Sequence, residues 1–266
     1  MILVLGGDGF VGSAYVRYLS QLGKNVISIN RANYDEYIGV KCDLFINANG
    51  NSKKFISKEN PKADFLASVA SVRNSLVDFN FSKYIFLSTS DVYPDCSRID
   101  ATKENSVLDC ISQSPYGFHK YLAELCVQHV ARDWLIIRQG GFVGYGLKKN
   151  SVFDILYSDK VWVNPQSRFQ FINTDHSARL VFKLIEKGIS NEIFNLTSAK
   201  TISVVEIMDL VGRYPSYEIN QPNVTYEIST EKASKFLELP TSYDSIIEFL
   251  GGINLTQSSK QVWINR

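Results

Sequence analysis

The chain has 266 residues, of which 45% are hydrophobic, and a formal charge of +1 at pH 7. It is long enough to bury the core of one large domain, or of a domain with a small appendage. The small net charge excludes a general attraction to nucleic acids or anionic membranes, and no apolar run approaches the roughly 18 residues of a membrane span.

The cysteines give no sign of a metal or redox site. The chain has four of them, widely spaced and without a Cys-x-x-Cys motif or a nearby histidine pair, which predicts reduced thiols and no bound metal. The first apolar run begins at Ile2, too early for a cleaved signal peptide. We therefore predict a cytoplasmic protein with neither a nucleic-acid nor a membrane partner.

In the first half of the chain, short apolar runs alternate with helical patterns. The expected strands are 2–5, 25–29, 44–48, 84–88 and 134–138, and the expected helices are 11–22, 62–79 and 115–131. This alternation predicts βαβ units and an α/β fold with a Rossmann-type doubly wound parallel sheet. Only about fourteen residues separate the second strand from Leu44, too few for a strand and a full crossover helix, so one unit is expected to be abbreviated.

Beyond Gly146 the predicted elements become shorter. A helix is expected at 177–187, a second begins at Ser203, where Glu206 completes a capping-box pattern, and a third lies near Ser242. We predict a dinucleotide-binding domain at 1–147 and a small substrate-binding lobe at 148–266, with helix 177–187 packing back on the first domain.

A glycine-rich turn directly follows the first strand. In LVLGGDGFVG, Gly6 permits a tight turn, Gly9 lets backbone amides approach a pyrophosphate, and Gly12 allows the following helix to pack closely. A turn that binds nothing is the alternative. The predicted cofactor site includes these glycines, with Phe10 and Val11 between them and Ala48 at the end of the third strand.

The residues that select the cofactor are expected at the end of the second strand, where the chain reads Asn30-Arg31. An acidic residue at the first position would bind the ribose hydroxyls of NAD and repel a 2′-phosphate, and Asn30 removes that repulsion. Arg31 would add charge-assisted hydrogen bonds to the phosphate. NADP is therefore favoured over NAD, the alternative being that Arg31 is a solvated surface residue.

Three Tyr-x-x-x-Lys pairs compete for a catalytic role. A lysine one helical turn from a tyrosine lies on the same face and favours the phenolate, so the pair requires a helix. Tyr37/Lys41 and Tyr145/Lys149 lie in glycine-containing, loop-like segments, whereas Tyr116 and Lys120 open an amphipathic helix that starts at Pro115. This reasoning selects Tyr116 and Lys120.

A hydroxyl at the carboxyl end of a neighbouring strand would complete the site. The run YIFLSTSDVYP ends in Ser88-Thr89-Ser90, at the sheet edge where doubly wound folds bind ligands. Hydroxyls at a strand end commonly form turns, which is the alternative. The order of the glycine turn, the hydroxyl and the Tyr-Lys pair along the chain favours a catalytic role for the hydroxyl.

With these motifs the chain resembles the extended short-chain dehydrogenase/reductases, in particular the NAD-dependent epimerase/dehydratase family of nucleotide-sugar enzymes. RQGGFVGYG and RFQFINTDHSARL are also similar to segments of that family. The resemblance implies that Tyr116 is the acid/base at a sugar oxygen, that Lys120 lowers its pKa and holds the nicotinamide ribose, and that Thr89 hydrogen-bonds the reacting oxygen.

The resemblance also implies that Arg168 grips the substrate diphosphate, an arginine on the lobe surface being the alternative. Four departures from the family matter, two of them being the abbreviated unit after Arg31 and a chain that is short for an epimerase, and the other two changing site residues. Gly141 replaces a substrate-contacting Asn, and Ser90-Asp91 replaces the Asp-Glu pair of the dehydratases. The loss of the Asp-Glu pair weakens a dehydratase assignment, although Asp91 stays a candidate substrate contact.

The predicted function is an NAD(P)-dependent oxidoreductase acting on a nucleotide-diphosphate sugar, with a 4-keto-6-deoxyhexose reductase favoured. One alternative is a nucleotide-sugar 4-epimerase with tightly bound NAD, and another is a non-catalytic NADP-binding Rossmann protein. Helices 62–79 and 115–131 carry apolar stripes that would suit either a homodimer interface or packing on the sheet.

Overall fold

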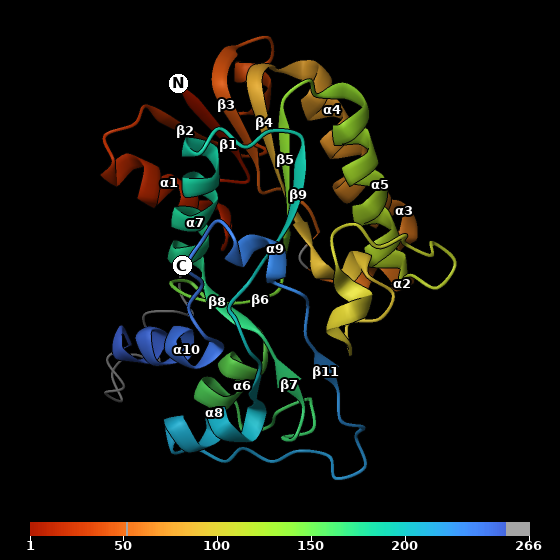
Figure 1. Ribbon diagram of the computed structural model, residues 1–266, viewed down its shortest axis with the longest axis vertical. Coiled ribbons are helices and arrows are strands. Elements are labelled where there is room, and N and C mark those ends of the chain that lie inside the picture. Colours follow the sequence, from red (N-terminus) through yellow and green to blue (C-terminus); the bar gives the residue numbers. More distant parts are fainter. Residues whose placement is uncertain (52, 254–266) are drawn as a thin grey trace.

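The computed structural model describes residues 1–51 and 53–253. Its centre is a six-stranded parallel sheet with helices on both faces (Figure 1), which confirms the predicted fold class. The strand order is β2-β1-β3-β4-β5-β9. The strands are β1 (Ile2–Leu5), β2 (Val26–Ile29), β3 (Lys41–Asn47), β4 (Asn80–Thr89), β5 (Trp134–Gln139) and β9 (Glu192–Leu196).

The two faces of the sheet are covered by different helices because apolar side chains alternate along the strands. On β1, Ile2 and Val4 face the cluster formed with α1 (Gly12–Gln21), α7 (Thr174–Glu186) and α9 (Glu231–Ser234). Leu3 and Leu5 face the opposite cluster. That face is covered by α4 (Ser71–Asp78) and α5 (Pro115–Val130).

The predicted helix 62–79 is continuous but changes its winding. It comprises α3 (Pro61–Phe65), a π-helical turn η2 (Leu66–Ala70) and α4, and it is preceded by α2 (Ile56–Glu59). The buried side of α4 and α5 packs on the sheet, while Val77 and Leu125 stay exposed. Formation of a homodimer through these helices stays a prediction.

The abbreviated unit is present as expected. After β2 the chain makes only the 3-10 helix η1 (Tyr34–Tyr37) and then enters β3 on the far side of β1. The sheet therefore ends at β2, where doubly wound sheets usually have a further strand. Because the connections reverse direction between β1 and β3, a ligand-binding crevice is expected at the carboxyl ends of these strands.

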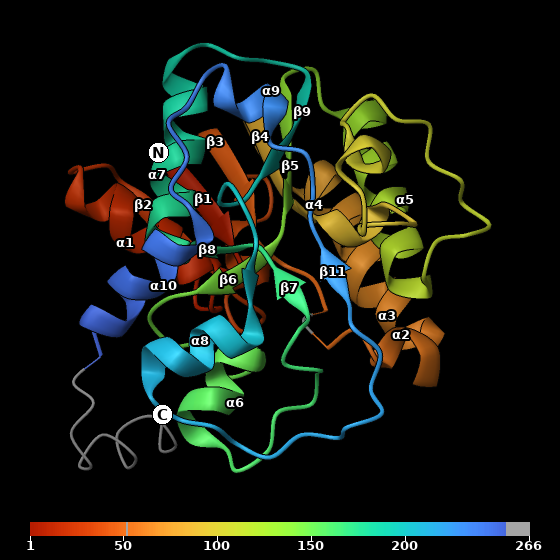
Figure 2. The same ribbon diagram turned by 60° about the horizontal axis from the view of Figure 1, so that its bottom comes forward.

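The C-terminal lobe lies beyond the carboxyl edge of the sheet, and Figure 2 turns it toward the viewer. A separate apolar core joins its helices and short strands. These elements are α6 (Ser151–Tyr157), α8 (Val204–Val211), α10 (Ser242–Gly251), β6 (Gly141–Val143), β8 (Phe171–Asn173), β7 (Arg168–Phe169) and β10 (Ile202–Ser203). Strand β11 (Thr225–Tyr226) pairs with β7, and its Tyr226 packs on a smaller cluster that includes Val92 and Tyr93. Ser203 and Glu206 form the predicted capping box of α8.

The chain returns to the first domain in the middle of the segment predicted as lobe. Helix α7 begins three residues earlier than expected and contacts α1, and β9 completes the sheet beside β5. Strand β9 was not predicted, because its five residues include Glu192 and Asn195 among the apolar ones. The last residues of the predicted lobe, 254–266, lie outside the described residues.

A buried ion pair ties α5 to the sheet. Arg138 on β5 donates from Nη2 to Glu124 Oε2 on α5 over 2.7 Å, and their side chains are 2% and 0% exposed. Ser88 on β4 donates to Glu124 Oε1 over 2.5 Å, and Arg138 Nη1 donates to the Tyr93 hydroxyl over 2.9 Å. Burial lowers the pKa of Arg138, but the charge and hydrogen bonds of Glu124, together with Tyr93, outweigh it and hold that pKa above its ordinary value, so the arginine stays charged.

We predict that Glu124→Gln destabilises the fold by about 3–5 kcal/mol, because it leaves the Arg138 charge buried without a counter-ion. Urea unfolding followed by circular dichroism would measure this loss. Glu218→Gln is the matched control, since it removes an exposed pair with Lys160 and should leave the unfolding midpoint unchanged. A loss below about 1 kcal/mol for Glu124→Gln would show that the buried pair contributes no more than a surface pair.

Candidate active site

A cavity of about 1900 Å³ lies between the carboxyl ends of the strands and the lobe. The glycine turn, the end of β4 and the start of α5 form one side, and Phe169, Tyr226 and Ile228 of the lobe contribute to the other. Pockets for one small ligand are usually about 300–1,000 Å³, so this cavity has room for a dinucleotide and a second ligand together.

The glycine turn is shaped so that other groups can approach its backbone closely. Gly6 has φ of +78°, and a Cβ on Gly12 would lie 2.2 Å from the Gly6 carbonyl oxygen, so the start of α1 packs directly on the turn. A Cβ on Gly9 would lie 3.1 Å from the same oxygen. The turn is thus open to a pyrophosphate and fits the dinucleotide that the sequence implies. The cavity is lined by all the predicted cofactor residues, which are Gly6, Gly9, Phe10, Val11, Gly12, Asn30, Arg31, Ala48 and Lys120.

Helix α5 starts as the sequence predicts and is pressed against the end of β4. The Ser114 hydroxyl accepts a hydrogen bond from the Gly117 amide over 3.1 Å, with Pro115 at the first helical position. A Cβ on Gly117 would lie 2.0 Å from the Asp91 carbonyl oxygen. Only glycine allows this approach, which brings Tyr116 beside the turn that carries Thr89 and Asp91.

The structure brings Thr89, Tyr116 and Lys120 to the same cavity. Burial raises the pKa of Tyr116 above its ordinary value, and the charges of Asp91 and Asp64 raise it further. Burial lowers the pKa of Lys120 to about 8, against the opposing effect of Glu124 and Asp64. The Lys120 amine donates to the Leu87 carbonyl over 3.1 Å and lies 4.2 Å from the centre of the Phe86 ring. The expected lowering of the Tyr116 pKa is therefore not found in this arrangement, where burial dominates.

Asp91 is the centre of a hydrogen-bonded cluster at the cavity wall. Its carboxylate accepts from Thr89 Oγ1 over 2.8 Å and from Lys54 Nζ over 2.7 Å, and also from the Tyr226 hydroxyl of the lobe. Lys54 Nζ lies 5.9 Å from the centre of the Tyr116 ring. Sequence reasoning missed Lys54 and Tyr226, because a loop lysine and an isolated lobe tyrosine carry no distinguishing pattern.

The structure does not bring Arg168 to the cavity. Its guanidinium pairs with Glu206 over 3.0 Å and bonds Thr201, because β7 places it beside the capping box of α8. Gly141 does line the cavity, but a Cβ there would lie 2.8 Å from the Gln170 carbonyl oxygen. The pairing of β6 with β8 thus leaves no space for the substrate-contacting Asn at this position.

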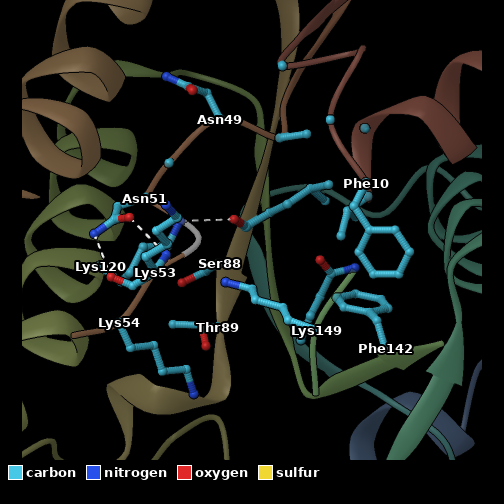
Figure 3. A pocket seen from close by; sticks show the side chains of 18 of the residues that line it. Phe10, Asn49, Asn51, Lys53, Lys54, Ser88, Thr89, Lys120, Phe142 and Lys149 are labelled. Atoms are coloured by element: carbon cyan, nitrogen blue, oxygen red, sulfur yellow. Dashed lines mark hydrogen bonds between the residues drawn. The ribbon is translucent and has the colours of Figure 1, made fainter. Parts of the chain in front are cut away.

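The basic side chains at this part of the cavity wall are lysines from two loops. Lys53 and Lys54 follow β3, Lys148 and Lys149 follow β6, and all four line the cavity. In Figure 3 the Lys149 side chain extends toward Ser88 and Thr89. Burial lowers the pKa of Lys149, and the charges of Lys53 and Lys54 lower it further, so the three amines lie close enough to repel one another. This arrangement suits an anionic ligand.

The described part of the chain contains neither a cluster of side chains placed to hold a metal nor a helix suited to span a membrane. Within residues 1–51 and 53–253, no group of three or more His, Cys, Asp or Glu side chains is placed to hold a metal ion. No helix in these ranges has the length and apolar character needed to cross a bilayer.

Comparison with known proteins identifies relatives among nucleotide-sugar enzymes. The family model "NAD dependent epimerase/dehydratase family" matches residues 2–197. A GDP-6-deoxy-D-talose 4-dehydrogenase from Aggregatibacter actinomycetemcomitans is 23% identical over 239 residues, covering 79% of this chain and 78% of the relative.

Two solved structures share the fold over nearly their full length. The dTDP-4-dehydrorhamnose reductase of Bacillus anthracis, in complex with NADP, has a TM-score of 0.80 at 14% identity, covering 95% of this chain and 98% of that one. The UDP-glucuronic acid 4-epimerase of Bacillus cereus, in complex with UDP-glucuronic acid and NAD, has a TM-score of 0.76 at 17% identity, covering 94% and 98%. The family match, together with the glycine turn and the Thr-Tyr-Lys constellation in one cavity, shows that this chain belongs to the NAD-dependent epimerase/dehydratase family of extended short-chain dehydrogenase/reductases.

Proposed function

We propose that this protein reduces the 4-keto group of a nucleotide-diphosphate-linked 6-deoxyhexose, using a nicotinamide dinucleotide. The observation that carries the proposal is that Thr89, Tyr116 and Lys120 line one cavity together with the glycine turn. A tyrosine with its ordinary pKa near 10 is protonated at neutral pH, and burial raises the pKa of Tyr116 further. A protonated tyrosine is suited to donate a proton to a carbonyl oxygen, which is the reductive direction.

The remaining roles follow from the residues around Tyr116. When bound, the nicotinamide ring supplies the reducing hydride to the sugar carbon. The phenol of Tyr116 gives its proton to the sugar oxygen, and Thr89 on the same cavity wall hydrogen-bonds that oxygen once its hydroxyl turns away from Asp91, to which it donates here. The Lys120 ammonium, buried beneath the cavity, stabilises negative charge that develops on the phenol oxygen as the proton leaves.

The GDP-6-deoxy-D-talose 4-dehydrogenase to which the chain is similar supports hydride transfer at carbon 4. A dehydrogenase that oxidises carbon 4 of a GDP-linked 6-deoxysugar is, in the reverse direction, a 4-ketoreductase. A 4-epimerase would use the same three side chains, but it would keep its cofactor bound and return the hydride to the same sugar.

The reductase proposal is tested by mixing the purified protein with NADH or NADPH and a panel of GDP-, dTDP- and UDP-linked 4-keto-6-deoxyhexoses. We expect loss of absorbance at the reduced-nicotinamide band with at least one sugar, and a loss of kcat of at least about a hundredfold in Tyr116→Phe. No consumption with any sugar, together with stoichiometric nicotinamide in the protein as purified, would favour the epimerase. Full activity in Tyr116→Phe would refute the catalytic assignment.

The pH dependence of kcat/KM should report the titration of the Lys120 ammonium. Its pKa of about 8 lies below the ordinary lysine value, so the ammonium predominates at pH 7 and is lost as the pH rises through about 8. We expect kcat/KM for reduction to fall by up to about tenfold per pH unit above that value, since this ratio follows the free enzyme. A flat profile from pH 7 to 10 would contradict a role for the charged lysine.

We further propose that Lys149 and Lys53 hold the substrate diphosphate in place of Arg168. Burial lowers the Lys149 pKa and the charges of Lys53 and Lys54 add to this effect, and a polyphosphate would relieve that mutual repulsion. We expect Lys149→Gln to raise the KM for the sugar nucleotide by about tenfold with little change in kcat, because the contact is equal in the ground and transition states. The exposed Lys187 lies outside the cavity, so Lys187→Gln is the control, and an unchanged KM in Lys149→Gln would refute the assignment.

A further inference from the structure

The position that selects the cofactor is occupied by a residue from the glycine turn. The side-chain Nδ2 of Asn30, just after β2, donates to Asp8 Oδ2 over 2.6 Å, and Ser28 Oγ donates to Asp8 Oδ1 over 2.6 Å. The carboxylate therefore lies where doubly wound sheets bind the adenosine ribose, although it comes from a residue 22 positions earlier in the chain.

The glycine turn fixes this carboxylate above β2. A Cβ on Gly7 would lie 2.5 Å from Ser28 Oγ, so the turn passes directly over that serine and brings Asp8 within its reach. Asn30 is held in turn by its own Oδ1, which accepts a hydrogen bond from the Ala32 amide over 2.8 Å. Asp8, Asn30 and Arg31 all line the cavity.

Asp8 is charged and still has acceptor capacity. The hydrogen bonds from Ser28 and Asn30 lower its pKa. Each carboxylate oxygen can accept two hydrogen bonds, so each retains one site for a further donor such as a ribose hydroxyl. Both present donors are neutral, and within residues 1–51 and 53–253 no Lys, Arg or His forms an ion pair with Asp8, so its negative charge is not cancelled.

We propose that Asp8 is the residue that selects the cofactor, accepting hydrogen bonds from the adenosine ribose hydroxyls and favouring NAD over NADP. The inference rests on the dinucleotide site of the proposed function. A cofactor site of this kind reverses the preference for NADP over NAD that Asn30-Arg31 alone predicts. The acidic group absent from the end of β2 is supplied by the glycine turn, and its charge repels a 2′-phosphate that Arg31 would otherwise attract.

The test is an equilibrium titration of the full chain with NADH and with NADPH, followed by nicotinamide fluorescence and without any sugar. For the unmodified protein we expect NADH to bind at least about tenfold more tightly than NADPH. Asp8→Asn keeps the shape and removes the charge, so we expect it to weaken NADH binding, to strengthen NADPH binding, and to reduce the preference by about tenfold or more.

Asp35→Asn is the control, because Asp35 also lines the cavity but makes no hydrogen bond to Asn30. Tighter binding of NADPH by the unmodified protein would overturn the proposal, even if Asp8→Asn failed to fold. An equal change in the preference between NADH and NADPH in Asp8→Asn and Asp35→Asn would also overturn the proposal. Such a result would reflect the overall electrostatic field of the cavity. Because no sugar is present, a failure of the reductase proposal would leave this result unaffected.

Discussion

The buried ion pair between Glu124 and Arg138 fixes the geometry on which the active site depends. Glu124 lies one helical turn beyond Lys120 on α5, and it accepts a hydrogen bond from Ser88, the residue before Thr89. The pair thereby ties the helix that carries the Tyr-Lys pair to the strand that carries the hydroxyl. Two opposite charges buried together are costly to separate, which keeps α5 in one register on the sheet.

The same network extends across the sheet to the lobe. Arg138 bonds the Tyr93 hydroxyl, which donates to Asn195 on β9 over 2.9 Å. The side-chain Nδ2 of Asn195 then donates to the Thr102 carbonyl over 2.7 Å and to the Ser229 carbonyl over 2.9 Å. Ser229 follows the segment that brings Tyr226 to Asp91. The central ion pair is thus linked by hydrogen bonds to Ser229, which lies three residues from Tyr226 at the cavity wall.

Local pattern was sufficient to predict the central features of the fold and site. The glycine turn, the helix opening at Pro115 and the hydroxyl at the end of β4 are each encoded within about ten neighbouring residues, and the structure brings them to one cavity. The abbreviated unit after β2 followed from chain length alone, because too few residues were available for a crossover helix.

The remaining features depend on contacts between distant residues. Arg168 has the expected residue type, but the capping-box Glu206 competes for its charge. Tyr226 contacts Asp91 across 135 positions of the chain, and Asp8 contacts Asn30 across 22. No local sequence pattern predicts either contact. The strand β9 was missed because the polar Asn195 is buried there by partners distant in sequence, which are Tyr93, Thr102 and Ser229.

The most direct test of the account is the origin of the hydrogen at carbon 4 of the product. The protein would be incubated with a 4-keto-6-deoxyhexose nucleotide and reduced nicotinamide cofactor deuterated at its transferable position, and the product examined by nuclear magnetic resonance. The account predicts one deuterium at carbon 4 for each cofactor oxidised. A 4-keto sugar recovered unreduced would contradict it, and a 4-hydroxy sugar nucleotide that inverts at carbon 4 without gaining deuterium in a parallel incubation would identify an epimerase.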